Sequence, residues 1–449
     1  MQQLAQGVIR LFDRYMPEPF TFGIVMTFMA MALAWGTTPS TPTEVLVAWG
    51  DGLIALLEFI TQVALTILFA FALAHLGPVP RLLNRLASLP SNPRAAYAFC
   101  ALFAGAVSLV AWPLGTILGG LMARQVAISC KQRNIHVHYP LLGGAAFGGF
   151  VVWHMGYTGS APLLVATPGN PMQDMLGGLV PVTETLLAPF NLLTICATLA
   201  VVASVAAILH PKQEAEIQPI EDESNGAANA FNELTATPPR AGPAGWIENS
   251  RWLTTLLGLC LVAYVLRWFL NRGIQLDLNI VNWIFLAACQ LLTRSAKEFS
   301  DVLMNGGRAV VPTLLQYPLY AGIMGVMLNT GFIAQLAEFF ARIGSVETLP
   351  LIAFLSGGVI NLFIPSGGAQ WAVQGPAFLE AAKVLGTAPE LIVMGVAYGD
   401  EWSNIIHPFV AIPLLIMTGL PANKVLSYSF IIFLAAGFPL AGGLLLASF

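Results

Sequence analysis

Two acidic residues stand side by side in an apolar stretch near the end of the chain. Asp400 and Glu401 lie in the string AYGDEWSNIIHPF, and Asn404 and His407 follow at steps of three or four residues. On a helix such spacings share one face, and an ionisable group inside a membrane span indicates function by default. We therefore predict a coupling-ion site for H⁺ or Na⁺ at these four residues. The alternative is that both acids are solvated at the outer end of the segment.

A second candidate site lies where the string IPSGG interrupts an apolar run at residues 364–368. Pro365 ends one helix, and the residues after it would start another, whose first turn leaves up to four N–H groups unpaired. Such a helix start carries about half a positive charge and binds small anions. The residues predicted to contact a carboxylate and its acyl chain are Asn361, Ser366, Gly367, Gly368, Gln370 and Trp371.

The first half of the chain contains a matching interruption. The string FCALFAGAVSLVAWPLGTILGGLM (99–122) has an apolar lead, a proline and glycines, and YTGSAPLLVATPGNP (157–171) follows it. Small residues often only let helices pack closely, and hydroxyls often bond to their own helix. Two interruptions at matching positions favour a binding site instead. Its predicted members from this half are Ser108, Trp112, Gly115, Thr116, Thr158, Gly159 and Ser160.

The remaining reactive side chains indicate neither an enzyme nor a metal site. His154 is expected to be a structural imidazole, and His136 and His138 lie in a hydrophilic loop without a third ligand. The five cysteines are scattered and form no CxxC pair, so they are expected to be apolar fillers. No nucleophile–base pair is evident, and no cofactor is expected apart from the coupling ion.

Composition indicates what must position these residues. The chain has 449 residues, of which 57% are hydrophobic and only 9% are charged, whereas soluble domains carry about a quarter charged residues. Many stretches reach the roughly 20 apolar residues that cross a bilayer. The chain is therefore predicted to be an all-α polytopic membrane protein. No basic stripe supports binding to nucleic acid.

About nine full spans are expected, together with two apolar stretches that Pro and Gly split near the middle. The split stretches, 96–128 and 349–385, are predicted to be re-entrant helical hairpins. Each is followed by a span interrupted by polar residues, at 154–171 and 399–413. The predicted spans are 18–35, 52–76, 141–166, 185–209, 252–270, 278–293, 309–330, 390–417 and 425–447.

Loop charges orient these spans, because cytoplasmic loops are rich in Lys and Arg. The count places the N-terminus inside and brings the two hairpins in from opposite faces. The halves then form inverted repeats, a pattern typical of secondary transporters, whose sites lie between the repeats. The predicted parts are an interfacial amphipathic helix (1–17), a first repeat (18–210), an acidic cytoplasmic linker (211–250), a connecting transmembrane helix (251–277) and a second repeat (278–449).

Several strings closely resemble the bacterial short-chain fatty acid transporter family. They are AWGDGLIALLEF (48–59), YTGSAPLLVATPGNP, IPSGG with its flanking QWAVQGP, and AYGDEWSNIIHPF, and the resemblance covers nearly the whole chain outside the linker. It implies an inner-membrane carrier of monocarboxylates such as acetoacetate and butyrate. The chain departs from the family pattern at Ala111, His154 and His407, where Asn, Gly and Gln are usual.

We therefore expect a symporter that binds a short-chain carboxylate within the lipid bilayer, works by alternating access and is driven by H⁺ or Na⁺. A homo-oligomer is a possible assembly. Two alternatives remain: a carrier of other small organic anions such as dicarboxylates, and a membrane protein that binds or senses its ligand without transporting it. The absence of an Arg near either interruption argues against dicarboxylates.

Overall fold

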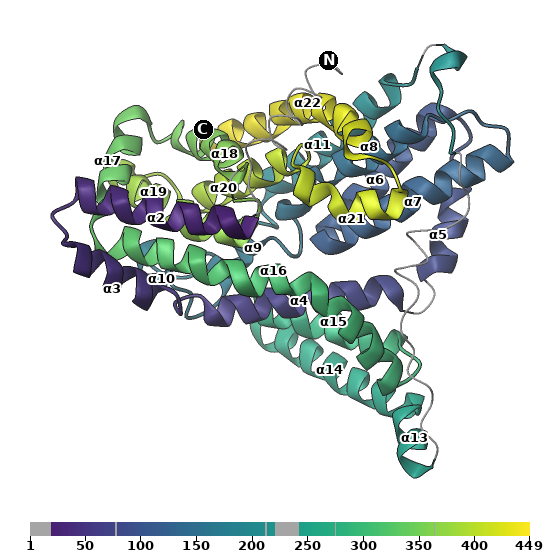
Figure 1. Ribbon diagram of the computed structural model, residues 1–449, viewed down its shortest axis with the longest axis horizontal. Helices are drawn as coiled ribbons and strands as arrows, with labels where there is room; N and C mark the ends of the chain where they lie inside the picture. Colours follow the sequence, from purple (N-terminus) through teal and green to yellow (C-terminus); the bar gives the residue numbers. More distant parts are fainter. Residues whose placement is uncertain (1–18, 77–78, 212, 221–241, 274, 363) are drawn as a thin grey trace.

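The computed structural model describes residues 19–76, 79–211, 213–220, 242–273, 275–362 and 364–449. Throughout these ranges the regular structure is helical and no strand occurs, so the predicted all-α class is confirmed (Figure 1). The predicted interfacial helix, residues 1–17, lies outside the described residues.

Among the described residues, the first half of the chain, up to the linker, contains ten α-helices and one short 3₁₀ helix, beginning with α2. In order they are α2 (Pro19–Thr37), α3 (Pro42–Gly52), α4 (Leu57–His75), α5 (Val79–Ala87), α6 (Pro93–Val110), α7 (Trp112–Gln132), α8 (Tyr139–Gly149), the 3₁₀ helix η1 (Phe150–Met155), α9 (Ser160–Ala166), α10 (Gln173–Leu176) and α11 (Pro189–Ile208).

The second half begins with two short pieces of the linker. They are the 3₁₀ turn η2 (Glu214–Glu216) and α13 (Pro243–Glu248). The longer helices that follow are α14 (Arg251–Arg272), α15 (Leu278–Leu292), α16 (Ala296–Asn329), α17 (Phe332–Ile343), α18 (Leu349–Asn361), α19 (Gly367–Leu385), α20 (Pro389–Asn404), α21 (Pro408–Thr418) and α22 (Ala422–Ser448).

Five helices within the described ranges are long and apolar enough to cross a membrane: α4, α6, α11, α14 and α22. A sixth candidate is the bent pair of residues 313–329 and α17, which meet at 79°. The other predicted spans contain shorter apolar helices or are broken, so the count of nine stays a prediction. α6 was expected to be one arm of a hairpin, yet its length alone suffices to span a bilayer.

The connecting helix of the prediction corresponds to α14, which lies at the edge of the molecule. It packs mainly on α15, which in turn packs on α4, and it lies in the lower part of the view in Figure 1. Only 11% of its most apolar window is buried by the protein. Its leucines therefore face outward, as expected for side chains that contact lipid.

The two halves contain corresponding series of elements. In the first half α6 and α7 pack on one another around a break at Ala111, which is extended with φ −157° and ψ 122°. In the second half α18 and α19 are separated by residues 362–366. The amphipathic helices α5 and α17 precede these pairs. We call α6–α7 and α18–α19 the first and second helix pairs.

Each helix pair is followed by a broken helix, as the sequence predicts. In the first half α8 and η1 lead to a non-helical turn at residues 156–159, after which α9 begins. In the second half α20 ends at Asn404, and α21 begins at Pro408. The inverted relation of the two halves, and the entry of each pair from one membrane face, stay predictions.

Part of the predicted linker lies against the membrane-embedded helices. The backbone N–H of Tyr139, at the start of α8, donates to the carbonyl oxygen of Gln218 at 2.8 Å. The N–H of Gln218 donates to Nδ1 of His138 at 3.0 Å, and Lys424 Nζ donates to Oε1 of the Gln218 side chain at 2.9 Å. Residues 213–220 are thereby attached to both α8 and α22.

Glycines allow α20 to lie very close to α18, and this contact positions the acidic residues that follow. A Cβ at Gly399 would collide with the carbonyl oxygen of Phe354 and lie 2.8 Å from the backbone nitrogen of Gly358. Both obstacles are backbone atoms, which cannot rotate away. We infer that even a methyl group would push the two helices apart.

The substitution Gly399→Ala should therefore lower the thermal unfolding midpoint of the purified protein, because overpacking typically costs about 1–3 kcal/mol. Gly442→Ala in α22 is the matched control, since a Cβ there meets nothing within 4 Å. Tryptophan fluorescence during heating would report both midpoints. Equal midpoints for the two variants would contradict the close packing of α18 and α20.

Candidate functional site

One cavity of about 520 Å³ lies where the two helix pairs and the two broken helices meet. The starts of α7 and α19 reach it, as do the start of α9 and the end of α20. α4, α16 and α21 complete the wall. Its lining residues are Val63, Ile67, Trp112, Pro113, Thr116, Ile117, Phe150, Trp153, Ser160, Thr313, Gln316, Tyr317, Pro365, Ser366, Gly367, Asn404, Phe409, Val410, Ile412 and Pro413.

The start of α19 fits tightly against the first half of the protein. Ser366 precedes the helix in an extended conformation, with φ −157° and ψ 110°, and its hydroxyl donates to Tyr317 Oη at 2.8 Å. A Cβ at Gly367 would collide with Cε1 of His154 and lie 2.7 Å from Ser160 Oγ. Glycine at this position therefore lets the helix start touch the broken helix of the other half.

The first turn of α19 retains backbone donors. The N–H of Gln370 donates to the carbonyl oxygen of Ser366 at 2.8 Å, and no side chain caps the helix. The amides of Gly368 and Ala369 have no acceptor among the residues that the structure describes. This helix start therefore keeps the polarity expected of an anion-binding end.

The start of α7 differs from this expectation because its first amide is already paired. The N–H of Trp112 donates to Thr158 Oγ1 at 3.0 Å, and those of Leu114 and Gly115 donate to the carbonyl oxygen of Ala111. Pro113 has no N–H. The break itself lies at Ala111, two residues before the predicted proline. This end therefore contributes side chains to the cavity rather than free amides.

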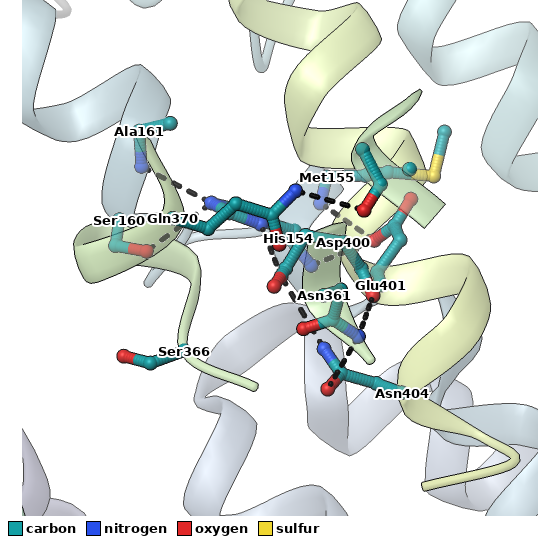
Figure 2. A network of polar contacts seen from close by, with 12 residues as sticks. His154, Met155, Ser160, Ala161, Asn361, Ser366, Gln370, Asp400, Glu401 and Asn404 are labelled. Atoms are coloured by element: carbon teal, nitrogen blue, oxygen red, sulfur yellow. Dashed lines mark hydrogen bonds and ion pairs between the residues drawn. The ribbon is translucent and has the colours of Figure 1, made fainter. Parts of the chain in front are cut away.

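Asp400 and Glu401 are sealed inside the protein, so the solvated alternative is wrong. Both side chains are 0% exposed. Oε2 of Glu401 accepts the backbone N–H of His154 at 2.7 Å and that of Met155 at 3.2 Å (Figure 2). Glu401 thus caps the end of η1, the point at which the first broken helix is interrupted.

His154 connects Asp400 to the start of α9. Its Nδ1 lies 2.9 Å from Asp400 Oδ2, and its Nε2 lies 3.1 Å from the backbone nitrogen of Ala161 and 3.2 Å from Ser160 Oγ. Figure 2 shows the ring between Asp400 and Glu401 on one side and Ser160 and Ala161 on the other. The sequence prediction treated this imidazole as structural and missed its position between the cavity wall and the buried acid.

Asn361 joins the second helix pair to the second broken helix. Its Nδ2 donates to the backbone oxygen of Asp400 at 2.9 Å, to Ser403 Oγ at 2.9 Å and to Asn404 Oδ1 at 3.2 Å. Asn404 Nδ2 in turn donates to Asp400 Oδ2 at 3.3 Å. These contacts hold α18 against the end of α20, where that helix reaches the cavity.

The predicted site residues fall into two groups. Six of them line the cavity: Trp112, Thr116, Ser160, Ser366, Gly367 and Asn404. The others lie behind its wall and hold the elements in place: Ser108, Gly115, Thr158, Gly159, Asn361, Gly368, Gln370, Trp371, Asp400, Glu401 and His407.

The wall that α16 contributes was missed by the sequence prediction. Thr313, Gln316 and Tyr317 face the cavity from this helix. The signal was present, because the string TLLQYP places polar side chains and a proline inside an otherwise apolar run.

The sequence also matches known transporters. A profile described as Short chain fatty acid transporter covers residues 1–447. The chain belongs to the short-chain fatty acid transporter family. It is 33% identical over 435 residues to a protein of Escherichia coli whose name describes a short-chain fatty acid transporter, covering 97% of each chain. A protein of Haemophilus influenzae with the same name is 30% identical over 422 residues and 93% of each chain.

A solved structure supports the fold independently of these sequence matches. The YdaH transporter of Alcanivorax borkumensis, described as having an unusual topology, superposes with a TM-score of 0.57. The match covers 96% of this chain and 98% of that one at 15% sequence identity. The similarity over nearly the full length of both chains supports the overall fold.

The cap on η1 generates a prediction about stability. Glu401→Ala would remove the side-chain oxygen that accepts the buried amides of His154 and Met155, at a cost of about 1–3 kcal/mol. Glu401→Gln keeps an acceptor oxygen of similar reach and should lower the unfolding midpoint less. Thermal unfolding of the two purified variants would test this. Equal losses would show that the two amides do not depend on the side-chain oxygen.

Proposed function

We propose that this protein is a secondary active transporter of short-chain fatty acids, carrying monocarboxylates such as acetoacetate and butyrate by symport with H⁺ or Na⁺. The observation that carries the proposal is the meeting of both helix pairs and both broken helices on one cavity. Transporters built from two repeats bind substrate between the repeats and expose the site alternately to the two sides. Family membership adds the substrate class.

The chemistry of the cavity suits a short acyl chain with a single charged end. Most of the wall is apolar, as the side chains of Val63, Ile67 and Ile117 illustrate. The polar groups are few and neutral, mainly hydroxyls and amides such as those of Ser160, Ser366 and Asn404. Binding sites of this composition bury the apolar part of a ligand and orient it through a small number of polar contacts.

The carboxylate would be held at the start of α19. Gly367 and Ser366 line the cavity there, and the next two amides of the helix have no described acceptor. A helix start attracts an anion through its N–H groups and its dipole. Thr116 at the start of α7 would add a hydroxyl donor from the first half.

The absence of Lys and Arg from the described lining favours a substrate with one carboxylate over a substrate with two. Among the residues whose side chains the structure describes, none that lines the cavity is Lys or Arg. A second carboxylate would have to leave water without a positive partner, which is costly. Dicarboxylates are therefore the less suitable substrates.

Coupling would involve Asp400, Glu401 and His407, which are sealed behind the wall, together with Asn404, which reaches the cavity. Charged groups at such depth are expensive and are usually tied to ion or proton movement. In this scheme the helix pairs enter a bacterial inner membrane from opposite faces, and the N-terminus is cytoplasmic.

Uptake of labelled butyrate into proteoliposomes tests the proposal, with protein-free liposomes to subtract passive entry of the undissociated acid. We expect saturable uptake that unlabelled acetoacetate inhibits and succinate does not. Imposed proton and sodium gradients, applied separately, identify the coupling ion. A reconstituted, folded protein without specific uptake under either gradient would refute the assignment and favour a binding or sensing role.

The start of α19 can be tested directly. Gly367→Ala should reduce the initial rate of uptake at least about tenfold, because the added methyl group would occupy space held by His154 and Ser160. Gly442→Ala, which adds the same group where nothing lies within 4 Å, is the control and should transport normally. Normal uptake by Gly367→Ala would place the substrate elsewhere.

A further inference from the structure

The buried imidazole of His154 touches both the cavity wall and a sealed acid. Ser160 lines the cavity, and its Oγ lies 3.2 Å from His154 Nε2. On the opposite side of the ring, Nδ1 lies 2.9 Å from Asp400 Oδ2. The side chains of His154 and Asp400 are both 0% exposed. Ser160, His154 and Asp400 therefore form an unbroken chain of hydrogen bonds from the cavity to the acid.

A backbone N–H group determines where the protons lie in this series of hydrogen bonds. The N–H of Ala161 can only donate, and it points to Nε2 at 3.1 Å. Nε2 therefore carries a lone pair, and the ring proton resides on Nδ1, where it is donated to Asp400. The Ser160 hydroxyl is free to donate to the same nitrogen. Every donor thus points from the cavity toward the carboxylate, as a proton-transfer chain requires.

We propose that Ser160, His154 and Asp400 form a proton relay that moves the coupling proton between the cavity and the sealed carboxylate. This inference rests on the proposed transport function and selects H⁺ as the coupling ion. In the Ser–His–Asp sites of hydrolases the same atom order, hydroxyl to Nε2 and Nδ1 to carboxylate, moves a proton from the hydroxyl to the ring while the Asp stays ionised. In the relay proposed here the sealed carboxylate takes up the proton. Here the chain has the same order but connects a substrate cavity to a buried acid.

The transfer balances without any further reactant. A hydronium ion in the cavity gives a proton to Ser160 Oγ and leaves as neutral water, while the hydroxyl proton moves to His154 Nε2 and the Nδ1 proton moves to Asp400 Oδ2. The relay thereby gains one proton and loses one negative charge. One monocarboxylate bound in the cavity then crosses together with one proton, and the pair carries no net charge.

Protonation would also change the contact between the two halves. Once Nε2 carries hydrogen it can no longer accept the N–H of Ala161, so the start of α9 loses its bond to the ring. The ring lies directly behind Gly367 and Ser160, both of which line the cavity. Proton uptake is therefore linked by contact to the wall that faces the substrate.

Few other ionisable groups face this imidazole. The elements that pack on η1 are α6, α7, α8, α11 and α20. Within the described chain, Asp400 bonds to the ring and Glu401 bonds to the backbone N–H of the same residue. Both belong to α20, and the ionisable side chains of the other four helices make no hydrogen bond or ion pair with His154. Tyr317 of α16 bonds to Ser366 on the far side of Gly367.

The substitution His154→Gln removes proton transfer but keeps the structural hydrogen bonds of the ring. The Gln amide can donate to Asp400 and accept from Ala161, but it cannot take up a proton. The dissociation constant of butyrate is measured by equilibrium binding to the purified wild-type protein without sodium. We expect it to rise about tenfold per pH unit on the alkaline side, because binding linked to one proton requires that slope. In His154→Gln this equilibrium slope should persist, because Asp400 holds the proton, whereas uptake driven by a proton gradient should slow about tenfold or more, because the path to Asp400 is interrupted. The surface substitution His136→Gln should keep both properties.

Ser160 provides a second test that leaves the His154–Asp400 bond intact. Ser160→Ala should slow uptake driven by a proton gradient about tenfold or more, and Ser160→Thr, which restores a hydroxyl, should recover most of the rate. Proton-driven uptake at the wild-type rate in His154→Gln would overturn the relay, as would wild-type uptake that needs sodium and ignores the proton gradient. In both cases the proposed function stands, whereas a folded wild type that neither binds nor transports butyrate overturns the function and the relay together.

Discussion

The structure depends on one constraint: a helix broken inside an apolar protein frees backbone N–H groups, and each of them must find an acceptor. Here the acceptors for the breaks of the first half come from elsewhere in the chain. Glu401 of α20 adds an acceptor for the amides of His154 and Met155, the last two residues of η1 before the break. Thr158 accepts the amide of Trp112 at the start of α7. The interruptions are therefore stable only when they lie together.

This mutual pairing also explains where the cavity lies. Because the interrupted segments must touch to satisfy one another, the ends of their helices meet at one place, and side chains cannot fill all of the space between them. Glycines then set how closely the walls approach, as Gly367 does against His154 and Ser160. The result is a neutral cavity with a layer of charged and polar groups directly behind it.

The interruptions of the helices could be predicted from the sequence, because Pro and Gly affect the backbone locally. Contacts between distant segments could not be predicted, because they leave no pattern in the local sequence. The second helix pair falls at 349–385 as predicted. The first breaks at Ala111, a residue with no turn preference, where Tyr157 and Thr158 bond to its neighbours Leu109 and Trp112. Hydropathy likewise could not count spans that are broken into shorter helices. The role of His154 was missed because its partner Asp400 lies 246 residues away.

The short distance between the cavity and the buried acids supports coupled transport for electrostatic reasons. A substrate carboxylate at the start of α19 would lie one layer of side chains from Asp400 and Glu401, where little water screens the charges. Like charges repel strongly in such surroundings, so binding of the anion and a negative charge on these acids oppose one another. A proton or cation that neutralises the cluster relieves this repulsion. By reciprocity, the bound anion must then favour uptake of the coupling ion by the same free energy. In the proposed mechanism, symport follows from the proximity of the two sites and requires no separate signalling pathway between them.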